Sequence, residues 1–258
     1  MKSKLIRAVI ENKIKIPYIC LNETHEYIGW TADFRFKLPN GENMKLDLNL
    51  DKDLFLLFVL ASAWSKTGPW ENATFFAGYL KYKAMDDYRL WCGKDEVTIL
   101  INKIKYDVEA FVKLCQGINP RKKVSFRKDF YNSVSIIANE WDVIKNKLEQ
   151  SEEKADYTIF INYISEIKGL GTGTNKMKIK IPLILRELRC QSKYSNIPGK
   201  LCCVPDARVI KAAKVFNIKL PSINSIKSIF KASNIIYENF GELYDIPLFA
   251  YEDLKEYV

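Results

Sequence analysis

The chain contains very little histidine, a single residue, His25, among 258. Zinc sites of the usual His and Cys kinds and Ser-His-Asp hydrolysis therefore lack the residues that they need. The six cysteines include no C-x-x-C pair and no spacing typical of a disulfide framework. We expect reduced thiols in a cytoplasmic protein, and we exclude these zinc and hydrolase classes.

The sequence also lacks a long apolar run. The longest apolar segment, Leu54–Trp64, has 11 residues, and a membrane-spanning helix needs roughly 18 or more. Lys, Arg and Glu are scattered among short apolar groups over the first 15 residues, so no secretory signal is expected. Because 48% of the residues are hydrophobic, the chain can bury a full core. These features predict a soluble, folded protein with no membrane partner.

Acidic residues are scarce in one part of the chain. The window from Lys168 to Lys231 holds 14 basic residues and two acids, Glu187 and Asp206, for a net charge of +12. The whole chain carries +9, so the basic excess is confined to this window. Such a concentration is expected of a surface that meets nucleic-acid phosphates. A solvated lysine-rich face is the alternative.

Hydrophobic spacing predicts a mainly α protein with one small β element. Apolar and polar residues alternate over 32–38 and 44–50 around the turn Pro39–Glu42, which predicts a β-hairpin. Apolar residues recur at helical spacing in the other segments, which are 1–22, 51–64, 75–82, 95–115, 125–148, 154–168, 182–190, 206–216, 222–240 and 248–257. Prolines stand near the starts of the C-terminal helices, where they are tolerated.

A glycine-rich segment, Ile167–Lys176, lies inside the basic window. Its glycines, Gly169, Gly171 and Gly173, allow backbone N–H groups to approach an anion, and the following helix start adds partial positive charge. A dinucleotide fingerprint would need a βαβ unit and an acid about 20 residues later, and the sequence shows neither. An ordinary glycine-rich connection between helices is the other alternative.

An isolated carboxylate follows this segment. Asp206 opens a predicted helix 30 residues after Lys176. The order of helix, glycine hairpin, lysine, helix and aspartate resembles the helix-hairpin-helix DNA glycosylases, and within them the archaeal 8-oxoguanine DNA glycosylases (AGOG). The motifs that carry this resemblance, spread over roughly 51–258, are Leu60–Gly68 with Phe75–Tyr79, Thr174–Lys176, Asp206–Val209 and Asp245–Leu248.

The resemblance implies a DNA-repair enzyme, a bifunctional glycosylase/lyase that excises 8-oxoguanine. Lys176 would attack the sugar C1′ and form a Schiff base, with the neutral amine favoured by crowding from Lys178 and Lys180. Asp206 would stabilise the developing oxocarbenium sugar and help to move protons. No metal or organic cofactor is implied. Since no cysteine follows Cys203, the four-cysteine iron–sulfur cluster of some related glycosylases is excluded.

The sequence departs from the family at Pro182, where the family has an uninterrupted helix. A proline at this point forces a kink or a helix start near Ile181. Lys176 would then lie in the loop, and Lys178 or Lys180 would be rival nucleophiles.

Two further groups of site residues are predicted from the resemblance. Trp70 or Trp64 would stack on the flipped base, and Glu26 and the pair Asp253 with Tyr257, four residues apart on one helical face, would read it. Ordinary core packing is the alternative for each aromatic residue. The expected DNA contacts are Gly169, Gly171, Gly173, Thr174, Asn175, Lys178 and Arg208.

The expected architecture is two helical subdomains around a cleft, with Lys176 facing Asp206. Residues 1–50 form an N-terminal helix and β-hairpin, 51–160 with 241–258 form one helical subdomain, and 161–240 form the helix-hairpin-helix subdomain. The expected partner is double-stranded DNA with a damaged base, bound by a monomer in the cytoplasm with the nucleoid. A non-catalytic nucleic-acid-binding protein, a glycosylase for another lesion and a basic helical scaffold remain alternatives.

Overall fold

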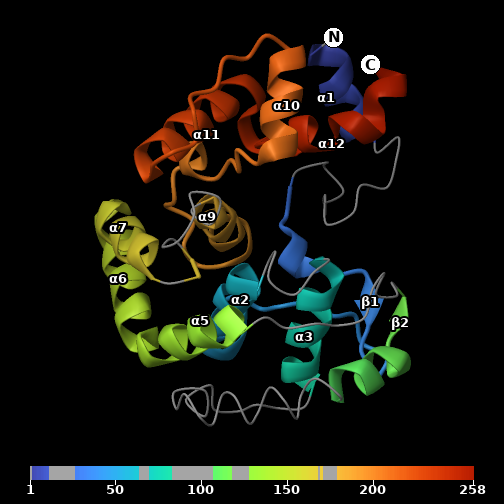
Figure 1. Cartoon of the computed structure of the whole chain (residues 1–258), viewed down its shortest axis with the longest axis vertical. Coiled ribbons are helices and arrows are strands. Elements are labelled where there is room, and N and C mark those ends of the chain that lie inside the picture. The colour runs from blue at the N-terminus through green and yellow to red at the C-terminus, as the bar shows by residue number, and fades with distance from the viewer. Residues whose placement is uncertain are drawn as a thin grey trace. The chain divides into compact units, whose positions relative to one another are not determined.

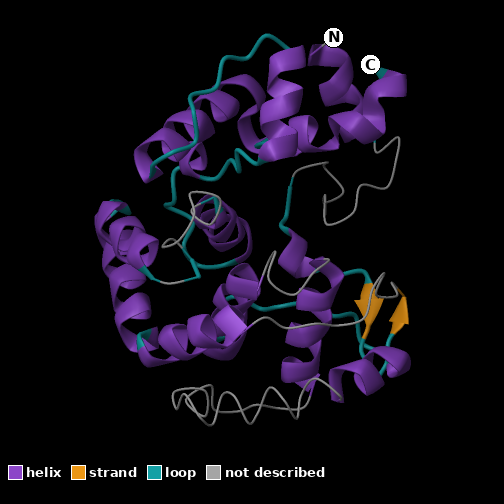
Figure 2. Ribbon diagram, in the orientation of Figure 1, coloured by secondary structure: helices purple, strands orange, loops and turns teal. Residues whose placement is uncertain are grey.

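A computed structural model describes residues 2–11, 27–63, 70–82, 107–117, 128–167, 169–170 and 179–258. The chain divides into two compact units (Figure 1). Unit 1 combines Met1–Trp30 with Thr174–Val258, and unit 2 is the continuous segment Thr31–Gly173. The expected mainly α class with a small β element is confirmed, since helices predominate and two short strands pair (Figure 2).

Unit 2 contains the β element and a group of apolar helices. Its elements are β1 (Phe36–Lys37), α2 (Asp51–Ala63), α3 (Trp70–Tyr82), β2 (Gln116–Gly117), α5 (Lys128–Asn139), α6 (Trp141–Lys154) and α7 (Thr158–Glu166). Residues 107–114 are also helical. A 3-10 turn, η1 (Trp30–Ala32), spans the boundary with unit 1.

The predicted hairpin of 32–50 is only partly formed. The Met44 N–H donates to the Phe36 carbonyl at 2.9 Å, and the Phe34 N–H donates to the Met44 carbonyl at 3.1 Å. The strand ladder, however, joins β1 antiparallel to β2, with Phe36 opposite Gly117. Residues 45–50 are not a strand. Their alternation is nevertheless real, because Met44, Leu46 and Leu48 are all buried, so the segment covers the core without joining the ladder.

The core of unit 2 forms around α2. This helix is apolar on all sides and almost wholly buried, as expected of a central helix. The Trp141 ring packs edge-on against Phe55 and Phe58, with centroids 5.3 and 5.4 Å away. Trp141 also starts α6, because the helix predicted over 125–148 is broken at Glu140. Within the described ranges, no helix is long and apolar enough to cross a membrane.

Unit 1 is helical throughout its described part. Its elements are α1 (Lys2–Ile10), α9 (Lys180–Gln191), η3 (Gly199–Leu201), α10 (Ala207–Val215), α11 (Ile226–Phe240), η4 (Gly241–Leu243), α12 (Ile246–Leu254) and η5 (Lys255–Tyr257). Local signals explain their starts. Ser225 and Ser228 form a capping box for α11, and Pro182 and Pro247 lie in the first turns of α9 and α12.

The unit boundaries differ from the expected domains. Residues 241–258 belong to unit 1 with 174–240, although they were expected to join 51–160. The reason is the packing of α12 against α1 and α10 (Figure 1), together with the ion pair between Lys211 and Glu252 at 2.6 Å. The N-terminal 50 residues also divide, since only those up to Trp30 belong to unit 1.

Candidate functional site

The segment that leads into α10 is held by α11 and by the residue that precedes α12. The Val204 N–H donates to Asp245 Oδ1 at 2.8 Å, next to the start of α12. The Cys203 N–H donates to Ser233 Oγ of α11 at 2.9 Å, and this hydroxyl donates to the Lys200 carbonyl at 2.7 Å. Backbone groups of this loop are thus paired where water is excluded. The loop has one fixed path up to Asp206.

A buried ion pair stands behind this loop. The Arg186 guanidinium of α9 donates to Asp245 Oδ1 at 2.7 Å, and both side chains are buried. Arg186 also lies over the Tyr27 ring at 4.9 Å. The Tyr27 hydroxyl donates to Glu187 Oε1 at 2.6 Å, and burial raises the pKa of Tyr27. Tyr27, Arg186, Glu187 and Asp245 therefore form one buried polar cluster inside unit 1.

Asp206 is the N-cap of α10, as the sequence predicted. Its Oδ1 accepts the Val209 N–H at 2.9 Å, the bond by which an aspartate caps a helix. Burial raises the pKa of Asp206 above the ordinary 3.8, and the charge of Asp245 adds to the shift. The cap hydrogen bond and Arg208 act in the opposite direction and are outweighed. The site thus holds a carboxyl group whose proton affinity is higher than usual, which suits proton transfer.

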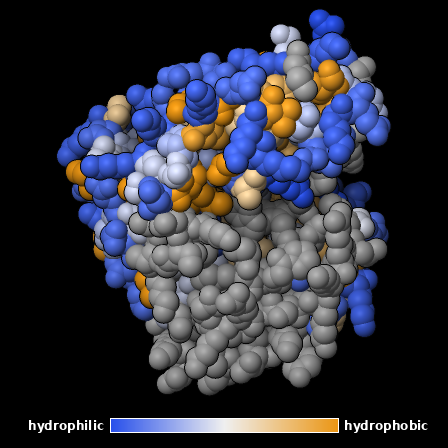
Figure 3. Space-filling view, turned by 45° about the horizontal axis from the view of Figure 1, so that its top comes forward, coloured by the Kyte–Doolittle hydropathy of each residue, from blue (hydrophilic) through white to orange (hydrophobic). Residues whose placement is uncertain are grey.

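Positive charge surrounds this carboxylate along α10. Arg208 is exposed, and its guanidinium lies 5.1 Å from the centroid of the Phe249 ring. Lys211 and Lys214 follow on the same helix and are also exposed. Figure 3 shows that this end of the molecule presents mostly hydrophilic residues, with hydrophobic residues gathered between them. Arg208, Lys211 and Lys214 of the basic window are therefore on the surface, in keeping with an anionic partner, whereas Lys180 and Arg186 are buried.

The described thiols are poor nucleophiles. Burial raises the pKa of Cys190 and of Cys115 to about 11, and it raises those of Cys202 and Cys203 as well. A thiol must be ionised to attack, so these cysteines stay protonated near neutral pH.

Several predicted site residues lie outside the described residues. These are Glu26, Trp64, Gly171, Gly173, Thr174, Asn175, Lys176 and Lys178. Lys176 facing Asp206 therefore stays a prediction. Gly169 is described and has a φ of +99°, a conformation that glycine adopts readily, in the turn after α7.

Lys180 is the one rival nucleophile that the described ranges include. It is the first residue of α9, and it is 2% exposed. The predicted helix start near Ile181 is thereby confirmed, and Pro182 falls in the first turn instead of kinking the helix.

The described residues that were predicted to read a base lie on three different elements. Trp70 is the first residue of α3 in unit 2. Asp253 and Tyr257 do not share an uninterrupted α-helix, because α12 ends at Leu254 and Tyr257 lies in η5. Both side chains are exposed. In the described part of the chain, no hydrogen bond joins either of them to Asp206.

Sequence reasoning missed the residues that position Asp206. Asp245 was read only as part of a helix entry, and Arg186 and Glu187 only as charges in the basic window. One signal was available: Arg186 and Glu187 interrupt the apolar run from Ile181 to Leu188. Opposite charges inside a buried helix need partners, and this need pointed to a polar cluster.

We expect Arg186→Met to destabilise the protein. The change leaves Asp245 buried without its partner, and loss of one member of a buried pair lowers the free energy of unfolding by about 3 to 5 kcal/mol. Chemical denaturation followed by circular dichroism measures this. The control, Lys211→Gln, breaks the exposed pair with Glu252 and should leave the unfolding midpoint unchanged. Equal losses in the two variants would contradict a special role for the buried pair.

We expect Asp206→Asn to stabilise the protein at neutral pH. Because the folded-state pKa is raised, the stability that the protonated carboxyl contributes is complete below 3.8 and is lost as pH rises through the folded pKa. Asparagine caps helices equally well and carries no charge. The free energies of unfolding of wild type and Asp206→Asn, measured by denaturation at about pH 3 and about pH 7, should therefore differ only at the higher pH. A variant less stable than wild type at neutral pH would refute this.

Comparison of the chain with protein-family models, curated proteins and solved structures finds no match. The functional assignment therefore depends on the residues themselves.

Proposed function

We propose that this protein is a bifunctional DNA glycosylase and AP lyase that excises 8-oxoguanine from double-stranded DNA. The observation that carries the proposal is Asp206, a carboxyl group with a raised pKa at the start of a helix whose other charged residues are basic. A carboxylate in such a place repels phosphate, so it does not strengthen DNA binding. An enzyme that must stabilise a cationic sugar does benefit from a carboxylate at this position.

The chemistry assigns one role to a lysine and one to Asp206. The target nucleotide is flipped out of the duplex so that its C1′ can be reached. The amine of Lys176 bonds to C1′ while the bond from C1′ to the base breaks and the base takes the electron pair. Asp206 stabilises the positive charge on the sugar and accepts the proton that the amine loses. Ring opening then gives a Schiff base, from which β-elimination releases the 3′ phosphate.

Phosphate contacts position the duplex for this reaction. The glycine hairpin from Gly169 to Gly173 with Thr174, Asn175 and Lys178 is proposed to hold one phosphate, and Arg208 a second. The protein would act as a monomer on damaged DNA in the cytoplasm, without metal or organic cofactor.

One observation favours a second candidate function. The bond from the Val209 N–H to Asp206 is an ordinary helix cap, and a cap alone accounts for an aspartate at this position. On this view the protein binds nucleic acid without catalysis. A glycosylase for another damaged base is a closer alternative that keeps both roles.

Borohydride trapping on a duplex with a single 8-oxoguanine tests the proposal. Wild type should form a covalent adduct, because borohydride reduces the Schiff base, and Lys176→Gln should form none. Asp206→Asn should slow single-turnover base release by about 100-fold or more. The matched controls are Lys227→Gln and Glu238→Gln, which make the same chemical changes on exposed residues of α11 and should behave as wild type.

Three results would change the assignment. An adduct that persists in Lys176→Gln moves the nucleophile to Lys178 or Lys180, each tested by its own glutamine variant. Trapping on other lesions but not on 8-oxoguanine changes the substrate. Binding of DNA with no adduct and no base release on any lesion leaves the non-catalytic function.

A further inference from the structure

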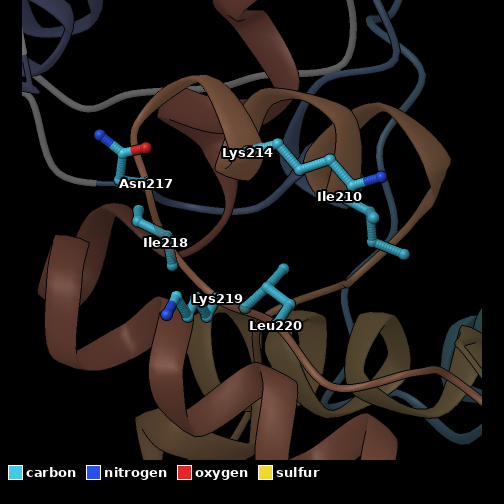
Figure 4. Close-up of a pocket in the computed structure, with 6 residues that line it drawn as sticks. All are labelled: Ile210, Lys214, Asn217, Ile218, Lys219 and Leu220. Carbon is cyan, nitrogen blue, oxygen red and sulfur yellow. The ribbon is translucent and has the colours of Figure 1, made fainter.

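A cavity of about 340 Å³ lies at the C-terminal end of α10, away from the helix start that carries Asp206. It is lined by Ile210, Lys214, Asn217, Ile218, Lys219 and Leu220 (Figure 4). The volume is at the small end of the range for ligand sites, roughly 300 to 1,000 Å³. None of the earlier site predictions includes these residues.

The end of α10 beside this cavity pairs two of the last carbonyls of the helix. Asn217 adopts a left-handed φ of +57°. Its N–H donates to the Lys214 carbonyl at 3.1 Å, and the Ile218 N–H donates to the Ala213 carbonyl at 2.8 Å. This is a Schellman motif, which satisfies the last carbonyls of the helix. The partial negative charge of the helix end is therefore partly neutralised next to the two lysines.

The charged residues that line the cavity are both basic. Lys214 and Lys219 are exposed, and no acidic residue lines the cavity. In the described part of the protein neither lysine makes an ion pair, whereas Lys211, one turn earlier on α10, is paired with Glu252. Two ammonium groups that pair with no carboxylate among the described residues favour an anionic ligand.

The apolar lining and the direction of the lysines define the ligand further. Ile210, Ile218 and Leu220 supply an apolar wall. In Figure 4 the Lys214 side chain ends beside Ile210, and the Lys219 amine lies on the opposite side of the view, below Ile218. A ligand with an apolar middle and an anionic group at each end fits this arrangement. One nucleoside of a DNA strand, with its two flanking phosphates, has that form.

We propose that this cavity binds one nucleoside unit of the DNA backbone, with the deoxyribose on the apolar wall and the flanking phosphates on Lys214 and Lys219. The proposal rests on the proposed function, because it takes DNA as the partner. It adds a contact with the strand beyond those proposed for the glycine segment and Arg208, at the opposite end of α10 from Asp206. Since phosphate contacts carry no sequence information, the contact would fix the register of the duplex for any lesion.

Salt-dependent binding of an undamaged, labelled duplex tests the cavity without catalysis. Each lysine that meets a phosphate contributes about 0.9 to the slope of log affinity against log salt concentration. Lys214→Gln and Lys219→Gln should each lower that slope by about 0.9, and the double variant by about 1.8. Lys154→Gln removes the same charge from an exposed position of α6 in unit 2 and should keep the wild-type slope.

Leu220→Ala tests the apolar wall separately. Loss of roughly 30 Å² of apolar contact should weaken binding about threefold. The salt slope should stay at its wild-type value, because no charge is removed. Circular dichroism verifies that each variant is folded. An unchanged affinity would reduce the cavity to a basic surface patch and overturn the proposal.

Two further measurements, binding of a free nucleotide and borohydride trapping, distinguish failure of this inference from failure of the proposed function. If a deoxynucleoside monophosphate binds as tightly as the duplex and with the same dependence on both lysines, the cavity is a site for free nucleotides and the proposal is wrong. If the lysine variants keep the wild-type slope while trapping succeeds, this inference fails and the glycosylase function stands. If the slopes fall but no adduct forms on any lesion, the DNA contact stands and the glycosylase function fails.

Discussion

The buried pair between Arg186 and Asp245 is the interaction on which unit 1 depends. Its two members lie 59 residues apart, and they join α9 to the entry of α12. Asp245 also binds the Val204 N–H, so the same carboxylate holds the loop that ends at Asp206. A buried charge without its partner is strongly destabilising. The Asp245 carboxylate therefore connects three segments that are distant in sequence: α9, the loop at Val204 and the entry of α12.

The carboxylate of Asp245 also influences the pKa of Asp206. The charge of Asp245 contributes to the raised pKa of Asp206, while Arg208 lowers it. Neutralising Asp245 would both loosen the loop and make Asp206 more acidic. Structural support of the loop and the proton affinity of Asp206 thus both depend on one buried residue, Asp245.

Helices were predictable from the sequence because their signals are local. Apolar spacing, the cap at Asp206 and the prolines in first turns all act within one or two turns of the chain. The break at Glu140 was missed, since 125–148 keeps its apolar spacing on both sides of it. The strand predicted over 44–50 was wrong for a different reason: alternation reports burial on one side, and Met44, Leu46 and Leu48 are buried without joining a strand ladder.

The site was predictable only where it is local. Asp206 as a helix start follows from its neighbours in sequence. The cluster of Tyr27, Arg186, Glu187 and Asp245 joins residues up to 218 positions apart, and the sequence alone does not show which charges meet. The same holds for the cavity at Asn217, which requires the left-handed residue and the path of 218–220.

The discontinuity of unit 1 has a consequence for biosynthesis. Helix α1 packs against α12, yet 236 residues of synthesis separate Ile10 from Ile246. At about 5 to 20 residues per second, the ribosome needs roughly 12 to 47 s to cover that interval. Unit 2 is continuous and is translated entirely within it. The nascent chain must therefore keep the apolar face of α1 in solution, or shielded by a chaperone, while the other unit is already able to fold.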